Sequence, residues 1–256
     1  MASSRISVVC PSRLEMAPSS RRRELYVERA VRSVRWQSAW ADFDWEIVIA
    51  VDRDRTGQVP LDRLGDVRVV ESDTVGQAAA VNAAVGATTG DFVAIIEDDD
   101  VWHWRKVALQ LSVLDGPNAP PFVSANQMEF DPAAGAARFN DFATPSGWLM
   151  RREIWDAVGP LNESFRWHVD NEWLGRLSAL RIPRLHLVEQ SGQRRGLFST
   201  LVKRSTVRET DERFPLVLRE VHTDAATARI TRDLASRRQS RDEYRRMIES
   251  FGEVPW

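Results

Sequence analysis

Cysteine is almost absent from this chain. Cys10 is the single cysteine among 256 residues, so no disulfide can form within the chain. It stands in an apolar run, which predicts a small core residue in a reducing compartment. No apolar run approaches the length of a membrane span, and residues 1–5 lack the apolar stretch of a signal peptide. We therefore expect a cytoplasmic protein.

An excess of charge of one sign is also missing. The chain carries 35 Lys and Arg against 37 Asp and Glu, which gives a formal net charge of −2. Nothing global draws it to nucleic acid or to an anionic membrane, so nucleic acid is disfavoured as a partner. At 256 residues, the chain is long enough to bury a core as one large domain or as a domain with an extension.

Short apolar runs alternate with helical patterns through the first hundred residues. This alternation is typical of an α/β fold in which helices cover a mostly parallel sheet. Strands are predicted over 6–10, 46–51, 67–70, 92–96 and 184–188, and helices over 23–36, 75–85, 101–114 and 170–180. After residue 117 the alternation loosens, which predicts a mixed sheet there, and residues 225–251 predict one or two amphipathic helices.

Polar residues follow the first four predicted strands at the point where each strand ends. Ligands of open α/β sheets bind beyond the carboxyl ends of the strands, so one edge should be lined by Pro11, Ser12, Arg13, Asp52, Asp73, Asp98, Asp99 and Asp100. The motifs GxGxxG and GxxxxGK[ST] are absent, which excludes the usual dinucleotide fingerprint and the P-loop. An acid-rich edge without a glycine cradle favours a metal-bridged diphosphate.

The acidic run at 97–100 is the most informative feature. It follows an apolar segment that predicts a buried strand, and adjacent carboxylates repel one another unless a cation neutralises them. Oxygen ligands suit Mg²⁺ or Mn²⁺, which bridge to substrate phosphates. A solvated acidic turn would explain the four acids alone equally well.

Several further segments carry a resemblance to a known family. They are SVVCPSR at 7–13, EIVIAVD at 46–52, GQAAAVNA at 76–83, EDD at 97–99, GWLMRR at 147–152, VGPLNESF at 158–165 and VDNEWLGRL at 169–177. In this order they resemble the motifs of the GT-A-fold glycosyltransferases of family 2, including the D-x-D motif and the E-D-x-D-x-x-x-R-L pattern. The likeness covers about residues 6–188. Val81, Glu97 and Val169 depart from the commonest motif residues.

The resemblance implies a GT-A fold, that is, a Rossmann-like, mostly parallel central sheet flanked by helices, with a helical C-terminal extension. It assigns residues 1–190 to the glycosyltransferase domain, with a nucleotide-binding half at about 1–115 and an acceptor-side half at about 116–190. Residues 191–256 would form a basic loop and the extension. The implied activity is metal-dependent, inverting transfer of a sugar from a nucleotide-sugar, most often a UDP-sugar, with Mn²⁺ or Mg²⁺ as the ion.

The resemblance also assigns roles to residues. Asp170 stands at the catalytic aspartate, and Asp99 becomes the direct metal ligand, supported by Asp100 and by His222, because a histidine from this region completes the metal shell in some related transferases. Donor contacts are implied for Pro11, Ser12, Arg13, Asp52, Asp73, Gln77, Asn82 and Asp98. Indole faces are good platforms for sugar rings, and acceptor or sugar contacts are expected from Trp148, Trp167, His168 and Glu172.

Residue types alone leave alternatives open. Asp170 would also suit a helix N-cap, His222 an ordinary surface site, and the arginines of 225–251 an exposed helical face. The basic segment 193–204 could close over a diphosphate or be a solvated charge run. The rival functions are a catalytically silent nucleotide- or carbohydrate-binding domain and a sugar-nucleotide nucleotidyltransferase. The acceptor, whether glycan, small molecule or protein, and the oligomeric state do not follow from the sequence.

Overall fold

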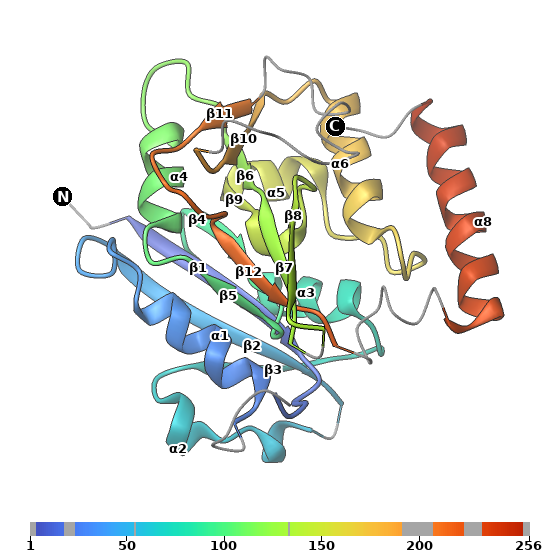
Figure 1. Cartoon of the computed structure of the whole chain (residues 1–256), viewed down its shortest axis with the longest axis horizontal. Coiled ribbons are helices and arrows are strands. Elements are labelled where there is room, and N and C mark those ends of the chain that lie inside the picture. Colours follow the sequence, from blue (N-terminus) through green and yellow to red (C-terminus); the bar gives the residue numbers. More distant parts are fainter. Residues whose placement is uncertain are drawn as a thin grey trace.

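The computed structural model describes residues 4–17, 24–53, 55–132, 134–190, 207–222 and 232–252. Its main feature is an eight-stranded sheet in the order β11-β10-β6-β9-β4-β1-β2-β3 (Figure 1). The strands are β1 (Arg5–Ser12), β2 (Asp44–Asp52), β3 (Arg68–Ser72), β4 (Phe92–Ile95), β6 (Phe122–Ala125), β9 (Leu149–Arg151), β10 (Arg184–Val188) and β11 (Val207–Glu209). Neighbours are parallel except at β9, which runs antiparallel to β4 and β6. The predicted mostly parallel sheet is confirmed.

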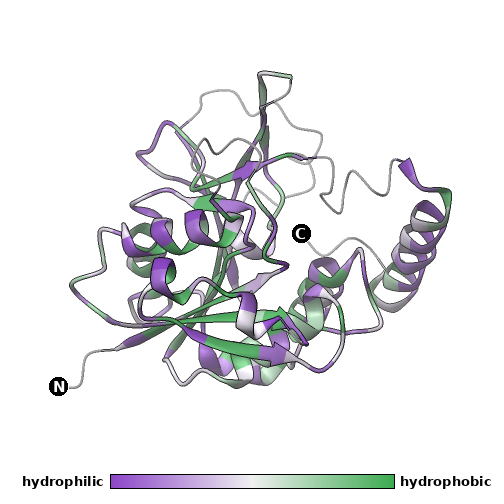
Figure 2. Cartoon of the chain, turned by 90° about the horizontal axis from the view of Figure 1, so that it is seen from below, coloured by the Kyte–Doolittle hydropathy of each residue, from purple (hydrophilic) through white to green (hydrophobic). Residues whose placement is uncertain are grey.

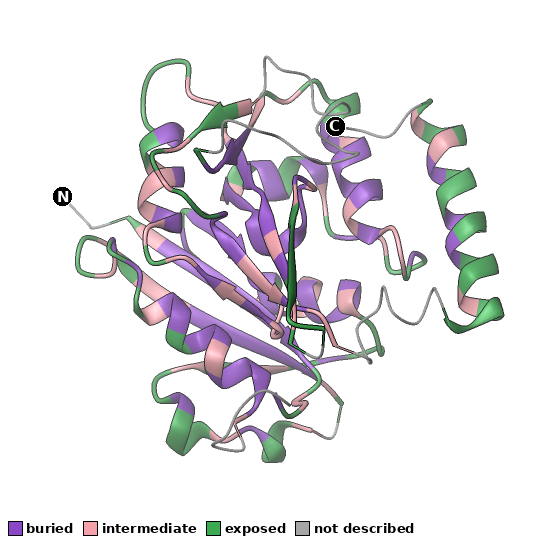
Figure 3. Cartoon of the chain, viewed as in Figure 1, coloured by how far each residue is buried: buried purple, intermediate pink, exposed green. Residues whose placement is uncertain are grey.

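Helices cover both faces of this sheet. Side chains alternate between the two faces along a strand, so Val8 and Cys10 of β1 pack on one side and Val9 on the other. The first side is covered by α1 (Tyr26–Arg35) and α4 (Lys106–Leu114), and the second by α3 (Gln77–Gly86), α5 (Arg152–Val158) and α6 (Val169–Ala179). Figure 3 shows the central strands buried between these layers. Shorter turns are α2 (Leu61–Leu64), η1 (Thr56–Gln58) and η2 (Pro145–Gly147).

A second, four-stranded sheet has the order β5-β12-β7-β8. Its strands are β5 (Asp100–Trp102), β12 (Val217–Glu220), β7 (Gln127–Asp131) and β8 (Ala136–Asn140). The predicted helix over 101–114 is therefore wrong at its start, since α4 begins only at Lys106. Residues 100–102 pair instead with β12, and this long-range pairing overrides the local helical pattern.

The last described helix is α8 (Leu234–Phe251), within the segment where amphipathic helices were predicted. Asp233 caps it, because its carboxylate accepts from the backbone N–H groups of Ala235 and Ser236. Figure 2 shows hydrophobic colour in the sheet strands and a largely hydrophilic α8. Nevertheless Met247 is fully buried, and a Cβ on Gly175 of α6 would overlap the Phe251 ring. None of the helices described is both long and apolar enough for a membrane crossing.

Candidate active site

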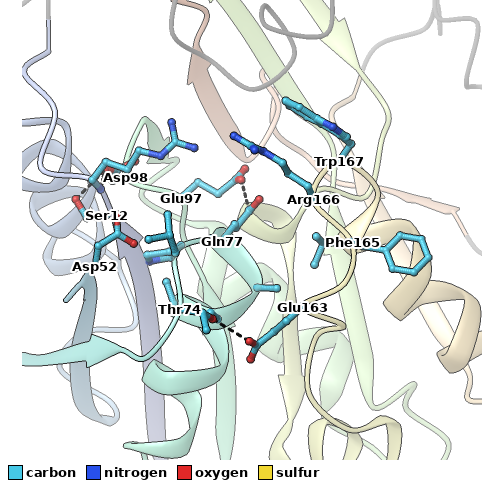
Figure 4. Close-up of a pocket in the computed structure, with 18 of the residues that line it drawn as sticks. Ser12, Asp52, Thr74, Gln77, Glu97, Asp98, Glu163, Phe165, Arg166 and Trp167 are labelled. Carbon is cyan, nitrogen blue, oxygen red and sulfur yellow. Dashed lines mark hydrogen bonds between the residues drawn. The ribbon is translucent and has the colours of Figure 1, made fainter. Parts of the chain in front are cut away.

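A cleft of about 640 Å³ opens beyond the carboxyl ends of β1, β2 and β4. Figure 4 shows Ser12, Asp52 and Asp98 on one side of it, and Glu163, Arg166 and Trp167 on the other, with Glu97 and Gln77 between them. The lining consists of residues 11–13, Glu15, Asp52, residues 74–80, 97–99, 163–167 and Val169, together with Arg219, His222 and Gln239. The predicted polar edge of the sheet is thus one wall of a cavity.

Three acids converge where the chain turns from β4 into β5. The backbone N–H of Asp100 donates to the carbonyl of Glu97 at 3.1 Å, which closes the turn. Glu97, Asp99 and Asp100 each place one carboxylate oxygen within 4.8 Å of the others. Asp98 points elsewhere, because the Ser12 hydroxyl donates to its Oδ2 at 2.7 Å. Three of the four acids therefore form a cluster, and the fourth, Asp98, is hydrogen-bonded to the loop after β1.

A histidine and an arginine of the C-terminal part face this cluster. Nε2 of His222 lies 3.4 Å from Oδ2 of Asp99. Arg219 stands in β12 in register with Asp100, and its charge acts on Glu97, Asp99 and Asp100. Neither residue belongs to a local sequence motif with the acids. The pairing of β12 with β5 is what brings Arg219 and His222 to them.

Burial and mutual repulsion separate the pKa values of these acids. Burial raises the pKa of Glu97 to about 7, against the effect of Arg219, and burial together with Asp99 raises the pKa of Asp98 to about 7. Burial, Asp99 and Glu97 raise the pKa of Asp100 well above its usual range. Burial would also raise the pKa of Asp99, but the His222 hydrogen bond and Arg219 bring it below the ordinary value. Asp99 is therefore the carboxylate held ionised.

The cluster fits a hard divalent cation. Both carboxylate oxygens of Asp100 are buried and lack a hydrogen-bond partner among the described residues, although buried carboxylates are normally satisfied. Three converging carboxylates and an imidazole offer the oxygen and nitrogen ligands that Mn²⁺ accepts, and the oxygens alone suit Mg²⁺.

Asp170 lies near this cluster, in the first turn of α6. The helix N-cap is His168, so the N-cap alternative for Asp170 is wrong. Its Oδ1 accepts from the backbone N–H of Asn171 at 2.8 Å, and its charge acts on Glu97. Burial raises the pKa of Asp170 to about 6. A carboxylate with this pKa can accept a proton near neutral pH.

Comparison with known proteins identifies the fold and a family that part of the chain resembles. Residues 8–131 match the family model described as glycosyl transferase family 2. This segment, just under half of the chain, is therefore similar to that family. Mannosyltransferase PcManGT from Pyrobaculum calidifontis, solved in complex with GDP-Man and Mn²⁺, superposes with a TM-score of 0.62 at 15% identity, over 95% of this chain and 65% of that chain. TarS 1–349 of S. aureus in complex with UDP gives a TM-score of 0.54 at 13% identity, over 96% and 72%.

At these identities the structural likeness shows the GT-A fold alone. A longer TarS structure is covered over only 44% of its length, and PcManGT over 65%, so this chain is shorter than the proteins it resembles. No curated protein sequence matches it significantly.

Most of the residues predicted for the donor and the metal lie in the cleft. The lining includes Pro11, Ser12, Arg13, Asp52, Gln77, Asp98, Asp99 and His222, while Asp100 is buried beneath it. Gln77 donates a hydrogen bond to Glu97, which orients that carboxylate. Two predicted donor residues lie outside the lining. The Asp73 side chain faces solvent beside Arg53. The Asn82 side chain accepts a hydrogen bond from the backbone N–H of Leu161 and donates one to its carbonyl.

Of the two tryptophans predicted to contact the acceptor or the sugar, one lies in the cleft and the other in the core. Trp167 lines the cleft. Trp148 instead is fully buried against Phe122 and Trp173, with its Nε1 donating to the carbonyl of Ala143 at 2.7 Å, so it belongs to the core.

Glu172 and His168 also lie outside the cleft lining. Glu172 pairs with Arg176 at 2.9 Å, and that arginine also donates to the carbonyls of Val158 and Pro160, so this pair fastens α6 to the preceding turn. His168 contacts α8 through Ser240, at 3.0 Å between Nε2 and Oγ.

Arg219 and Gln239 are cleft residues that the sequence did not single out. Arg219 lies three positions before His222, which was predicted as a metal ligand, so its position in the sequence could have indicated that it lies near the site. Gln239 had no comparable signal, because an uncharged residue among the arginines of a helix looks like an ordinary surface position. The basic segment 193–204 lies outside the described residues.

Proposed function

We propose that this chain is a metal-dependent, inverting glycosyltransferase that moves a sugar from a nucleotide-sugar, preferably a UDP-sugar, to an acceptor hydroxyl. One observation carries the proposal: a half-buried carboxylate of raised pKa, Asp170, lies near an acid cluster that fits a divalent cation, beside a cleft at the carboxyl edge of the sheet. UDP in the TarS structure and GDP-Man with Mn²⁺ in the PcManGT structure support a nucleotide-sugar donor.

In this proposal Asp170 is the base. Its carboxylate accepts the proton of the acceptor hydroxyl as the oxygen attacks the anomeric carbon, while the bond to the nucleoside diphosphate breaks. The Trp167 side of the cleft shields the reacting centre from water. A base opposite the leaving group gives inversion.

The leaving diphosphate needs positive charge. Asp99, Glu97, Asp100 and His222 would hold Mn²⁺ or Mg²⁺, which when bound stabilises the negative charge on the phosphates. Arg219 adds a permanent cation beside the same acids. Asp52, in the cleft at the end of β2, is proposed to accept hydrogen bonds from the ribose or the base.

The experiment is donor binding and turnover on one preparation. UDP should bind with Mn²⁺ and much more weakly with EDTA, and UDP-sugars should be hydrolysed slowly with Mn²⁺ even without an acceptor. UDP binding without any hydrolysis would favour the silent binding domain, and absence of both would refute the proposal. The nature of the acceptor, the division at residue 190 and a cytoplasmic location stay predictions.

A further inference from the structure

Helix α8 reaches the cleft, although its sequence predicted an exposed helical face. Gln239 is one of the cleft-lining residues, and Ser240, Glu243 and Met247 are buried, with only 1% of Glu243 exposed. Met247 belongs to the same apolar cluster as Trp173 of α6, and Phe251 packs against that cluster. Apolar contacts thus contribute to the docking of α8.

The Glu243 carboxylate binds three consecutive backbone amides. Oε1 accepts from the N–H of Arg166 at 3.0 Å, and Oε2 accepts from those of Trp167 at 2.7 Å and His168 at 3.3 Å. The side chain of Gln239 donates a further bond at 3.2 Å. No lysine or arginine ion pair to Glu243 occurs within the described ranges. The backbone amides therefore compensate for the burial of this charge.

These amides belong to the segment that leads into α6. Arg166 and Trp167 line the cleft, His168 is the N-cap of α6, and Asp170 follows in its first turn. His168 is fixed further by Ser240 of α8 and by a tilted contact with the Tyr244 ring, 5.6 Å between centroids. One face of α8 therefore fixes the path of the chain between the cleft wall and Asp170.

We propose that Glu243 is a positioning residue for the reaction: through the amides of residues 166–168, it fixes Trp167 at the cleft and Asp170 beside the acid cluster. This inference rests on the proposed function. Misplacing a reacting group by about 1 Å can cost roughly 100-fold in rate, so loss of the anchor should appear in kcat.

The test compares Glu243→Gln with two controls. Glutamine keeps the volume and one acceptor oxygen, but its NH₂ group must face amide donors. Asp242→Asn changes the neighbouring acid, whose side chain is 66% exposed and pairs with Arg245. Phe251→Ala weakens the docking of α8 without touching the amides. UDP affinity, donor KM, kcat for UDP-sugar hydrolysis with Mn²⁺ and melting temperature are measured for each protein.

Glu243→Gln should lower kcat roughly 10- to 100-fold, with UDP affinity and donor KM within about threefold of wild type. Asp242→Asn should match wild type, and Phe251→Ala should lower the melting temperature with a much smaller loss of kcat. A kcat within twofold of wild type in Glu243→Gln would overturn the inference. So would losses of kcat that follow melting temperature equally in Glu243→Gln and Phe251→Ala.

Two further measurements separate this inference from the proposed function. If Glu243→Gln does not fold, Ser240→Ala takes its place, because it removes only the His168 contact. This variant should lower kcat about threefold or more, and an unchanged kcat would count against the inference. Amide exchange at residues 166–168 should accelerate in Glu243→Gln but not in Phe251→Ala, and unchanged exchange would overturn the anchor even if hydrolysis is never detected. Failure of wild type to bind UDP or hydrolyse any donor would refute the proposed function instead.

Discussion

Without a divalent cation, the acid cluster should make the folded protein less stable as the pH rises from about 5 toward 7. Glu97 and Asp98 are half-buried beside other acids, and their partial desolvation raises the pKa of each to about 7. A carboxyl group with a raised pKa holds its proton in the folded state at pH values where the unfolded chain has lost it. The folded state is therefore favoured at low pH, and this advantage disappears between the ordinary pKa and the raised one.

The magnitude follows from Glu97 alone. Its pKa rises from 4.5 to about 7, and each pKa unit is worth about 1.4 kcal/mol, so the free energy of unfolding should fall by about 3 kcal/mol across this interval. Because Glu97 and Asp98 both interact with Asp99, we count one proton for the group rather than two. For a protein of this size, the loss corresponds to roughly 6–12 °C in melting temperature. Asp99 has a lowered pKa and acts in the opposite sense, but only below about pH 4.

The assay is thermal unfolding in EDTA from pH 5 to pH 8.5, repeated for Glu97→Gln. The difference in stability between the two proteins isolates the titration of Glu97 from all other titrations. Wild type should lose stability relative to Glu97→Gln up to about pH 7, and above that pH the two stability curves should run parallel. Saturating Mn²⁺ should abolish or reverse the trend, because the ion competes with protons for the carboxylates. Parallel curves in EDTA across the whole range would refute the reasoning.

Three further predictions concern single residues. Asp99→Asn should remove most metal-dependent UDP binding with the fold intact, which calorimetry with and without EDTA checks, and unchanged affinity in both conditions would contradict it. Asp52→Ala should weaken UDP by about 1–3 kcal/mol with a smaller effect on turnover, and an unaltered dissociation constant would return Asp52 to the role of a turn residue. Asp170→Asn should reduce transfer by roughly 10²- to 10⁴-fold with little change in donor affinity or melting temperature, and transfer within a few-fold of wild type would exclude it as the base.

The part of the fold that the sequence predicted correctly is the part in which local pattern and tertiary structure agree. β1, β2 and β4 are apolar runs buried on both faces, so their strand character is visible residue by residue. Parallel strands end at the same edge of a sheet, and this alone is enough to bring Ser12, Asp52 and the acidic run together. The start of the helix predicted over 101–114 failed because residues 100–102 pair with β12, more than 110 positions away.

For the site, the sequence distinguished charge better than aromatic character. A run of acids after a buried strand is compatible with a bound cation, and the resemblance to the D-x-D motif singled out Asp99 within that run. Tryptophan gives no such information, since the same indole suits a core and a sugar platform. Trp148 proved to be a core residue, whereas Trp167 lines the cleft. Glu243 carried no signal either, because its partners are backbone amides 75–77 positions away.

Residues of the C-terminal part complete the cleft, since Arg219, His222 and Gln239 line it. Three buried acids without nearby positive charge would strongly favour protonation, and a protonated cluster binds cations poorly. Arg219 and His222, supplied by β12 and the residue pair after it, lower the pKa of Asp99 and keep one carboxylate ionised. The pairing of β12 with β5 thus makes the metal affinity of the cluster depend on folding of the second sheet. The order of motifs along the chain does not reveal this dependence.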